Sequence, residues 1–162
     1  MACPTGALVA NTLVHAPLAR WAQARAQVVA LDDGHTQLTF AQLHAAVVQH
    51  ADTLIQQHAP ATVFVDDQLS IIEQMVSFMG IIHSGRCAAV SDPDWPSAVR
   101  DSVKRELGTA LTEPSHTHTA TPTSPFYIGF TSGSTGMPKG FRRHHQSWTE
   151  SLRVCLDTFG TD

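Results

Sequence analysis

Apolar residues recur at helical spacing in two central stretches of the chain, each directly after a capping signal. Thr39 followed by Gln42 is one capping box, and Ser70 followed by Glu73 is the other. The first predicts a helix over about residues 40–58, and the second predicts a helix of similar kind. The inward positions are Leu43, Val47 and Leu54 in the first helix and Met75, Val76, Met79 and Ile82 in the second.

Three short runs of β-branched, aromatic or small apolar residues predict strands. They lie at residues 62–65, 87–90 and 126–131. A further hairpin is predicted where Asp33-Gly34 stands between two apolar runs. Because strands alternate with helices, the pattern indicates an α/β fold with a largely parallel sheet flanked by helices.

Two more helices are predicted towards the C-terminus. Apolar residues spaced four apart predict one that Gly108 ends, before a strand at residues 109–112. Ser147 and Glu150 form a third capping box, which predicts the start of the last helix. On its apolar face, Cys155 is expected to be a buried small residue and not a nucleophile.

The composition indicates the general class of protein but not its activity. The 162 residues are 43% hydrophobic and 15% charged, which fits an ordinary globular domain. A net charge of −4 gives no general attraction to nucleic acid or anionic membrane, and no apolar stretch is long enough to span a bilayer. Three widely spaced cysteines form no disulfide or metal pattern, so a cytoplasmic location is expected.

The stretch TSGSTGMPKG, residues 131–140, has the chemistry of a polyphosphate-binding loop. Its glycines let the backbone approach a ligand closely, and successive N–H groups in such turns form anion-binding nests. Lys139 adds one mobile positive charge. The hydroxyl donors are Thr131, Ser132, Ser134 and Thr135, and the glycines are Gly133, Gly136 and Gly140.

Neither general nucleotide-binding pattern fits this loop. In a P-loop, glycine stands five residues after the first glycine, but here the residue is Pro138, and Lys139 is followed by Gly140 and not by a hydroxyl residue. In the dinucleotide fingerprint, a glycine stands where this chain has Thr131. A P-loop kinase or GTPase is therefore set aside.

FTSGSTGMPKG closely resembles the phosphate-binding loop [YF]TSG[ST]TGxPKG of the adenylate-forming superfamily, which includes acyl-CoA synthetases, peptide-synthetase adenylation domains and luciferases. Two upstream segments agree in order and spacing. LTFAQL at residues 38–43 is similar to "LTYAEL", and GIIHSGRCAAVSDPDWP at residues 80–96 is similar to "GILKAGxxYVPLDPxYP". The departures are Arg86, where a small residue is usual, and AAVSD in the strand.

The resemblance implies the N-terminal part of a ligase that uses ATP and Mg²⁺ to activate a carboxylic acid as an acyl-adenylate. Coenzyme A or a carrier pantetheine then usually accepts the acyl group. The implied phosphate-binding residues are Thr131, Ser132, Gly133, Ser134, Thr135, Gly136 and Lys139. His145 stands where the family often has a histidine, with no role assigned.

The remaining parts implied by the resemblance are not found in this sequence. The catalytic residues and the Mg²⁺ ligand are expected beyond Asp162, so this chain alone is expected to be inactive. Residues 1–112 would be the first part of the AMP-binding domain, residues 113–125 a Pro/Thr-rich linker, and residues 126–162 the strand, loop, strand and helix around the phosphates. The alternative is a non-catalytic remnant that binds a polyphosphate or a partner chain.

Several other side chains could suggest chemistry, but each has a simpler interpretation. His116 and His118 lie in the predicted linker without a third metal ligand, so a solvated loop is favoured. Asp92 and Asp94 flank Pro93, as is common in turns. The basic run at residues 142–145 is interpreted as a solvated turn that raises the local potential near a phosphate.

Overall fold

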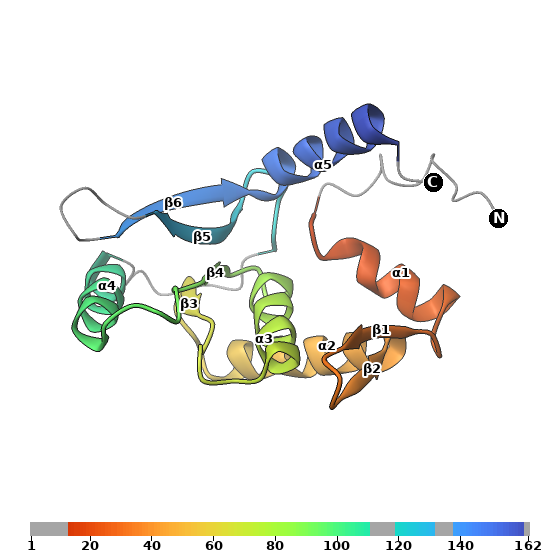
Figure 1. Ribbon diagram of the computed structural model, residues 1–162, viewed down its shortest axis with the longest axis horizontal. Helices are drawn as coiled ribbons and strands as arrows, with labels where there is room; N and C mark the ends of the chain where they lie inside the picture. The colour runs from red at the N-terminus through yellow and green to blue at the C-terminus, as the bar shows by residue number, and fades with distance from the viewer. Residues whose placement is uncertain (1–12, 111–118, 132–137, 161–162) are drawn as a thin grey trace.

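A computed structural model describes residues 13–110, 119–131 and 138–160 of the chain (Figure 1). The helices are α1 (Ala16–Ala24), α2 (Phe40–Gln56), α3 (Ile71–His83), α4 (Ser97–Ala110) and α5 (His145–Phe159). The strands are β1 (Val29–Asp32), β2 (Gln37–Thr39), β3 (Thr62–Phe64), β4 (Cys87–Ala89), β5 (Pro125–Thr131) and β6 (Lys139–His144).

The main sheet has the strand order β3-β4-β5-β6. Strands β3, β4 and β5 run parallel, with Val63 opposite Ala88 and Ala88 opposite Tyr127. Strand β6 pairs antiparallel with β5 at the edge. The predicted α/β fold with a largely parallel sheet and flanking helices is confirmed.

Helices cover the two faces of this sheet. On one face, Ala88 packs with Ile81 and Ile82 of α3 and Leu54 of α2. On the other face, Cys87 and Ala89 pack with Ile128, and Leu107 of α4 contacts this cluster. Figure 1 shows α2 and α3 gathered below the sheet and α4 beside the end of the β5–β6 hairpin. The alternation along β4 is what a strand buried on both faces requires.

Local signals in the sequence account for the start of the two central helices. Thr39 and Ser70 each accept a hydrogen bond from the backbone N–H of the third helical residue, Gln42 and Glu73, and both capping boxes are complete. Gly34 closes the β1–β2 hairpin with a φ of 84°, a conformation that costs glycine no steric strain. These predictions are confirmed.

Two predicted boundaries are wrong. Helix α4 continues past Gly108 to Ala110, so residues 109 and 110 are helical and not the start of a strand; residues 111 and 112 lie outside the described parts. Helix α5 begins at His145, before the predicted cap. Its first amides, of His145 and Gln146, donate to the carbonyls of Ser124 and Pro122, so these tertiary contacts replace the side-chain cap expected from Ser147.

The outer face of α5 is open in the described part of the chain. Cys155, expected to be buried, is exposed. Leu152, Val154 and Phe159 on the same helix are 49%, 58% and 80% exposed. Helical periodicity identified an apolar face correctly, but it could not show whether another element covers that face.

Arg86, which departs from the related sequences, has a defined structural place. Its side chain is buried, Nε donates to the carbonyl of Ala59 at 3.0 Å, and Nη1 donates to the carbonyl of Ser84 at 3.2 Å. Burial lowers the pKa of this guanidinium. The two carbonyls offset its desolvation and tie the segment after α2 to the end of α3.

Candidate functional site at the carboxyl edge of the sheet

The carboxyl ends of three parallel strands meet at one edge of the sheet. Asp67 follows β3, Ser91 follows β4, and Thr131 ends β5. Ligands of open α/β sheets bind at the carboxyl ends of the strands. This edge is therefore where the fold would be expected to hold a ligand.

The β5–β6 hairpin holds the two ends of the predicted phosphate-binding loop together. Thr131 and Lys139 are paired across the antiparallel ladder, and Thr131 Oγ1 donates to the Lys139 carbonyl at 3.4 Å. Both residues are exposed, so the hydroxyl and the ammonium can be reached by a ligand. The other predicted loop residues, Ser132, Gly133, Ser134, Thr135 and Gly136, lie outside the described residues.

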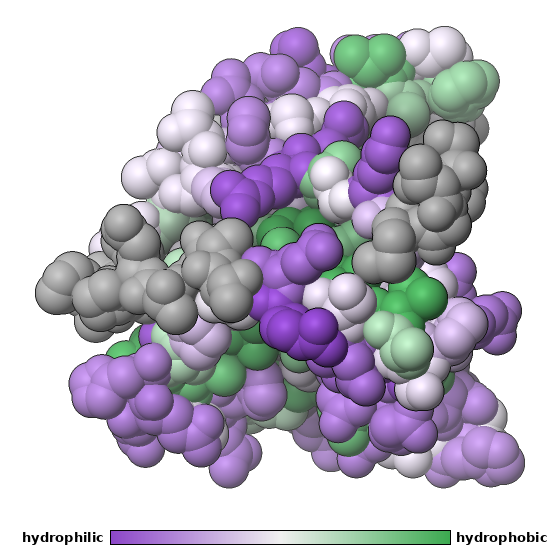
Figure 2. Space-filling view, turned by 90° about the vertical axis from the view of Figure 1, so that its left-hand side faces the viewer, coloured by the Kyte–Doolittle hydropathy of each residue, from purple (hydrophilic) through white to green (hydrophobic). Residues whose placement is uncertain are grey.

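Hydrophilic side chains dominate the described surface at the end of the molecule that carries α4. Figure 2 shows this end with apolar atoms visible between the polar ones. Lys139 and Arg142 are exposed on β6, while the guanidinium of Arg143 lies 5.6 Å from the ring centre of Trp148. The described part of the hairpin thus carries exposed positive charge on β6.

His145, the remaining candidate, is buried and not part of this surface. It is 1% exposed, its ring stacks on Phe126 at 4.9 Å, and its Nδ1 accepts a hydrogen bond from the Val14 N–H at 3.1 Å. Burial lowers its pKa to about 4, so the ring is neutral at pH 7. These contacts make His145 a packing residue at the start of α5.

Asp67 is the most highly connected carboxylate at the edge, and the sequence analysis did not single it out. It accepts from Gln68 Nε2 at 3.0 Å and from Ser91 Oγ at 3.3 Å, and it forms an ion pair with Arg100. The hydrogen bond from Gln68 is the largest cause of its lowered pKa, followed by the charge of Arg100 among the favourable contributions. Its place two residues after the strand predicted at residues 62–65 was the available signal.

Comparison with known proteins supports the adenylate-forming resemblance. A 69-residue segment, 43% of this chain, is 42% identical to an uncharacterized acyl-CoA ligase, YhfT, of Bacillus subtilis (strain 168). Among solved structures, a complex of VinN with 3-methylaspartate superposes with a TM-score of 0.75 over 92% of the chain at 18% identity. No protein-family model matches the chain.

The fold is that of the adenylate-forming enzymes. A fatty acyl-adenylate ligase from L. pneumophila, in complex with acyl adenylate and pyrophosphate, superposes with a TM-score of 0.75 over 98% of the chain at 14% identity. The 69-residue match covers 14% of the curated relative, and the superposed chain covers 52% of VinN and 35% of the L. pneumophila enzyme. It therefore corresponds to part of each of these proteins.

Other groups in this adenylate-forming fold are structural. Asp92 Oδ1 accepts from the Asp94 N–H at 2.9 Å, which confirms the turn around Pro93. Cys87 is buried, and burial raises the pKa of its thiol to about 12, so it remains protonated and unreactive. The described residues contain no group of three metal-ligating side chains and no helix that could cross a membrane, and His116 and His118 lie outside them.

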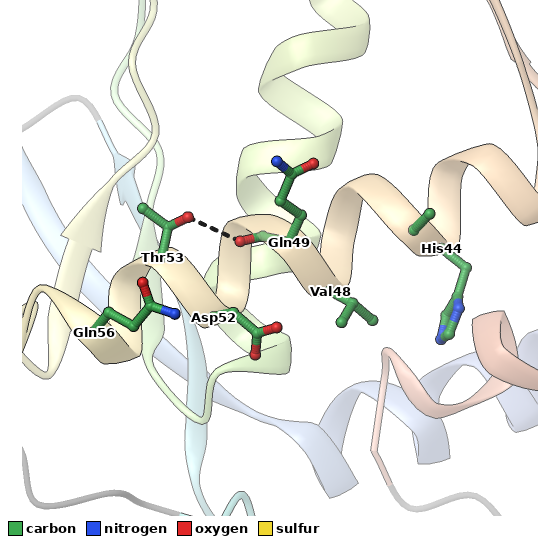
Figure 3. A pocket seen from close by; sticks show the side chains of 7 residues that line it. His44, Val48, Gln49, Asp52, Thr53 and Gln56 are labelled. Atoms are coloured by element: carbon green, nitrogen blue, oxygen red, sulfur yellow. Dashed lines mark hydrogen bonds between the residues drawn. The ribbon is translucent and has the colours of Figure 1, made fainter.

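A hollow of about 600 Å³ lies along α2, and none of its lining residues belongs to the β5–β6 hairpin. Figure 3 shows that its lining comes from this one helix, including His44, Gln49 and Asp52. The hydroxyl of Thr53 already donates to the Gln49 carbonyl at 2.9 Å. Ligand sites usually combine polar groups from several elements, so this hollow has little of the character of a ligand site.

Proposed function

We propose that this chain forms the N-terminal part of an AMP-forming carboxylate ligase. The observation that carries the proposal is the placement of the TSGSTGMPKG segment, whose two ends are held side by side on β5 and β6 at the carboxyl edge of the sheet. The acyl-adenylate and pyrophosphate bound to the L. pneumophila enzyme of the same fold support this choice.

In the proposed reaction, a carboxylate oxygen attacks the α-phosphorus of ATP. The new acyl–oxygen–phosphorus linkage forms as the bond from the α-phosphorus to the bridging oxygen breaks, and pyrophosphate leaves with the electron pair. Thr131, Ser132, Ser134 and Thr135 would donate to its oxygens, Gly133 and Gly136 would allow close backbone approach, and Lys139 would offset its charge. Preorganised donors of this kind contribute on the order of 3 kcal/mol each.

Mg²⁺ and an acyl acceptor are the further groups in the proposed reaction. Mg²⁺ would neutralise charge on the triphosphate, and the described residues contain no group of three metal-ligating side chains. Coenzyme A or a carrier pantetheine is the proposed acceptor, and the cytoplasm is the proposed location. In this proposal, residues 1–112 form the first part of the AMP-binding domain, residues 113–125 a linker, and residues 126–162 the phosphate-binding part.

The 162-residue chain alone is expected to give no ATP–pyrophosphate exchange with a panel of carboxylates, because it spans only 52% of VinN and 35% of the L. pneumophila ligase. Radioactive pyrophosphate incorporation into ATP is the measurement, with an intact acyl-CoA ligase as the positive control. Exchange above background by the purified chain would contradict the expected inactivity.

Replacing Lys139 with alanine is expected to weaken pyrophosphate binding to the chain by about tenfold or more, since a hydrogen bond to a charged group is worth about 1.5–3 kcal/mol. Isothermal titration calorimetry with pyrophosphate measures the change. Arg153→Ala is the matched control, because it removes one exposed positive charge from α5 and leaves the hairpin intact. Equal affinities for both variants would remove Lys139 from the proposed site.

A non-catalytic remnant that binds a polyphosphate or a partner chain remains the second candidate. The exposed apolar side chains of α5, especially Phe159 at 80%, favour a protein contact on that helix. Pyrophosphate binding combined with absent exchange in a protein that includes the natural C-terminus would favour this candidate over the ligase.

A further inference from the structure

Trp95 contacts the strand that leads into the phosphate-binding segment. It lies in the turn between β4 and α4, and its ring centre is 5.0 Å from that of Phe130, at an interplanar angle of 77°. Edge-to-face pairs of this kind are directional as well as apolar. Phe130 directly precedes Thr131 on β5, so the contact lies next to the Thr131 end of the phosphate-binding segment.

Arg100 of α4 holds the turn that carries Trp95. Its Nη2 donates to the carbonyl of Pro93 at 3.1 Å and to the carbonyl of Trp95 at 3.4 Å. One guanidinium therefore fixes two points of the backbone on either side of Asp94. Arginine is suited to this because its planar fork of donors is rigid.

The same guanidinium is anchored to the end of β3. Arg100 Nε lies 3.0 Å from Asp67 Oδ2, and the side chains of Arg100 and Asp67 are only 20% and 9% exposed. Nε is buried and has no hydrogen-bond partner in the described part of the chain, so the contact with Asp67 is an ion pair. Ser91, which follows β4, donates to the same carboxylate at 3.3 Å.

These contacts connect the carboxyl ends of all three parallel strands. Asp67 follows β3, Ser91 follows β4, and Phe130 lies near the end of β5. Arg100 connects the ends of β3 and β4 to the Trp95 turn, through its ion pair with Asp67 and its bond to the Trp95 carbonyl. The ring of Trp95 connects that turn to Phe130 of β5. The path passes through side chains that are separate from Thr131 and Lys139.

We propose that Trp95 and Arg100 are positioning residues for the phosphate-binding hairpin. Arg100 fixes the turn, Trp95 fixes Phe130, and the Thr131–Lys139 pair is thereby held in place to receive a pyrophosphate group. The proposal rests on the proposed function for its ligand. A positioning role differs from ordinary packing because loss of Trp95 should loosen one end of one hairpin and leave the remaining sheet unchanged.

Hydrogen exchange of the ligand-free chain tests the positioning contact directly. Trp95→Ala is expected to speed exchange of protected amides at residues 129–131 and 139–141 by tenfold or more, without changing those of β3 and β4. Trp95→Phe keeps an aromatic ring and should restore protection to within about twofold. Trp21→Ala is the control, because Trp21 packs against Phe40 on the far side of the fold. Unchanged exchange, or an equal increase in every element, would overturn the proposal.

Pyrophosphate titration tests the consequence for the ligand. Trp95→Ala and Arg100→Lys are each expected to weaken binding by about tenfold, and Trp95→Phe by less than about twofold. The double variant Trp95→Ala/Arg100→Lys should bind no more weakly than the weaker single variant, because both residues act along one path.

The two proposals fail in different ways. If the parent chain binds pyrophosphate and Trp95→Ala binds it equally well, the positioning role is overturned and the proposed function stands. If the parent chain binds no pyrophosphate, the proposed function of the hairpin fails, and with it the ligand part of this inference. The exchange result then still decides whether Trp95 fixes the hairpin.

Discussion

Lowering the pH from 7 to 4.5 is expected to reduce the free energy of unfolding by about 3 kcal/mol, chiefly through two histidines. His15 precedes α1, and His145 is the first residue of α5. Their ring centres are 5.5 Å apart, and that of His15 is also 5.2 Å from that of His83 at the end of α3. The cluster therefore joins three helices that are distant in sequence.

The pKa of each of these rings is lowered, which favours the neutral form. Burial is the largest cause that lowers the pKa of His15 to about 4, and the charges of His83 and His145 lower it further. Burial alone lowers the pKa of His145 to about 4. Burial also lowers the pKa of His83, as does His44, whereas Asp52 on α2 acts in the opposite direction. Protonating His145 would also place a proton on Nδ1, which accepts from the Val14 N–H.

The sign of the effect follows from these pKa values. Between pH 6.5 and about 4, the unfolded chain binds protons at His15 and His145 that the folded chain does not bind. Stability is therefore complete above pH 6.5, is lost as the pH falls towards 4, and changes no further from these groups below that value. The figure of about 3 kcal/mol is roughly half of the free energy that the two pKa shifts would give without solvent screening. The reduction is made because His15 is only partly buried.

Urea denaturation at pH 7 and pH 4.5 measures this loss. His145→Asn keeps an acceptor for the Val14 N–H and cannot titrate, so the difference between the two pH values should shrink by about half. His35→Asn, on the exposed β1–β2 turn, should leave the difference as in the parent chain. A variant at His145 with the full parental loss would contradict the assignment. The measurement stays above pH 4, because at lower pH the protonation of carboxylates with a lowered pKa, such as Asp67, also reduces the free energy of unfolding.

Replacing Gly80 with alanine is expected to destabilise the chain by about 2 kcal/mol, because α2 and α3 approach each other closely at this position. A methyl group on Gly80 would lie 2.6 Å from Cδ2 and 2.8 Å from Cβ of His50. The Cβ atom cannot move without the α2 backbone, so the two helices must separate. The nearby Ser77 Oγ and His50 Nε2, now 3.5 Å apart, would separate further.

Gly108→Ala is the matched control for this change, since it is the same substitution in a helix. Nothing lies within 4 Å of the added methyl group there, and the site is exposed on α4. Alanine should stabilise that helix by about 0.5 kcal/mol. Thermal and urea unfolding compare the two variants, and similar stabilities for both would show that the α2–α3 contact at Gly80 is not close-packed.

Much of the fold could be predicted because its signals are local. The capping boxes at Thr39 and Ser70 use groups three residues apart, and the Asp33-Gly34 turn uses adjacent residues. The start of α5 could not be predicted in this way, because the carbonyls that accept from its first amides belong to Pro122 and Ser124. Local patterns do not contain partners supplied by another segment.

For the candidate site too, local features could be predicted from the sequence, and contacts between distant segments could not. The donors of TSGSTGMPKG could be identified from residue type and spacing, and the proposed phosphate chemistry depends on them. That His145 is buried against Phe126, and that Trp95, Arg100 and Asp67 converge at the same edge, could not be inferred, because these residues come from separate elements.

The order of residues alone thus determined the alternation of helices and strands and the chemical character of the segment between Thr131 and Gly140. Only the tertiary structure decided which histidines are buried, which apolar faces are covered, and which side chains brace the hairpin. Periodicity and capping depend on neighbours along the chain, whereas burial and cross-sheet contacts depend on where distant segments meet.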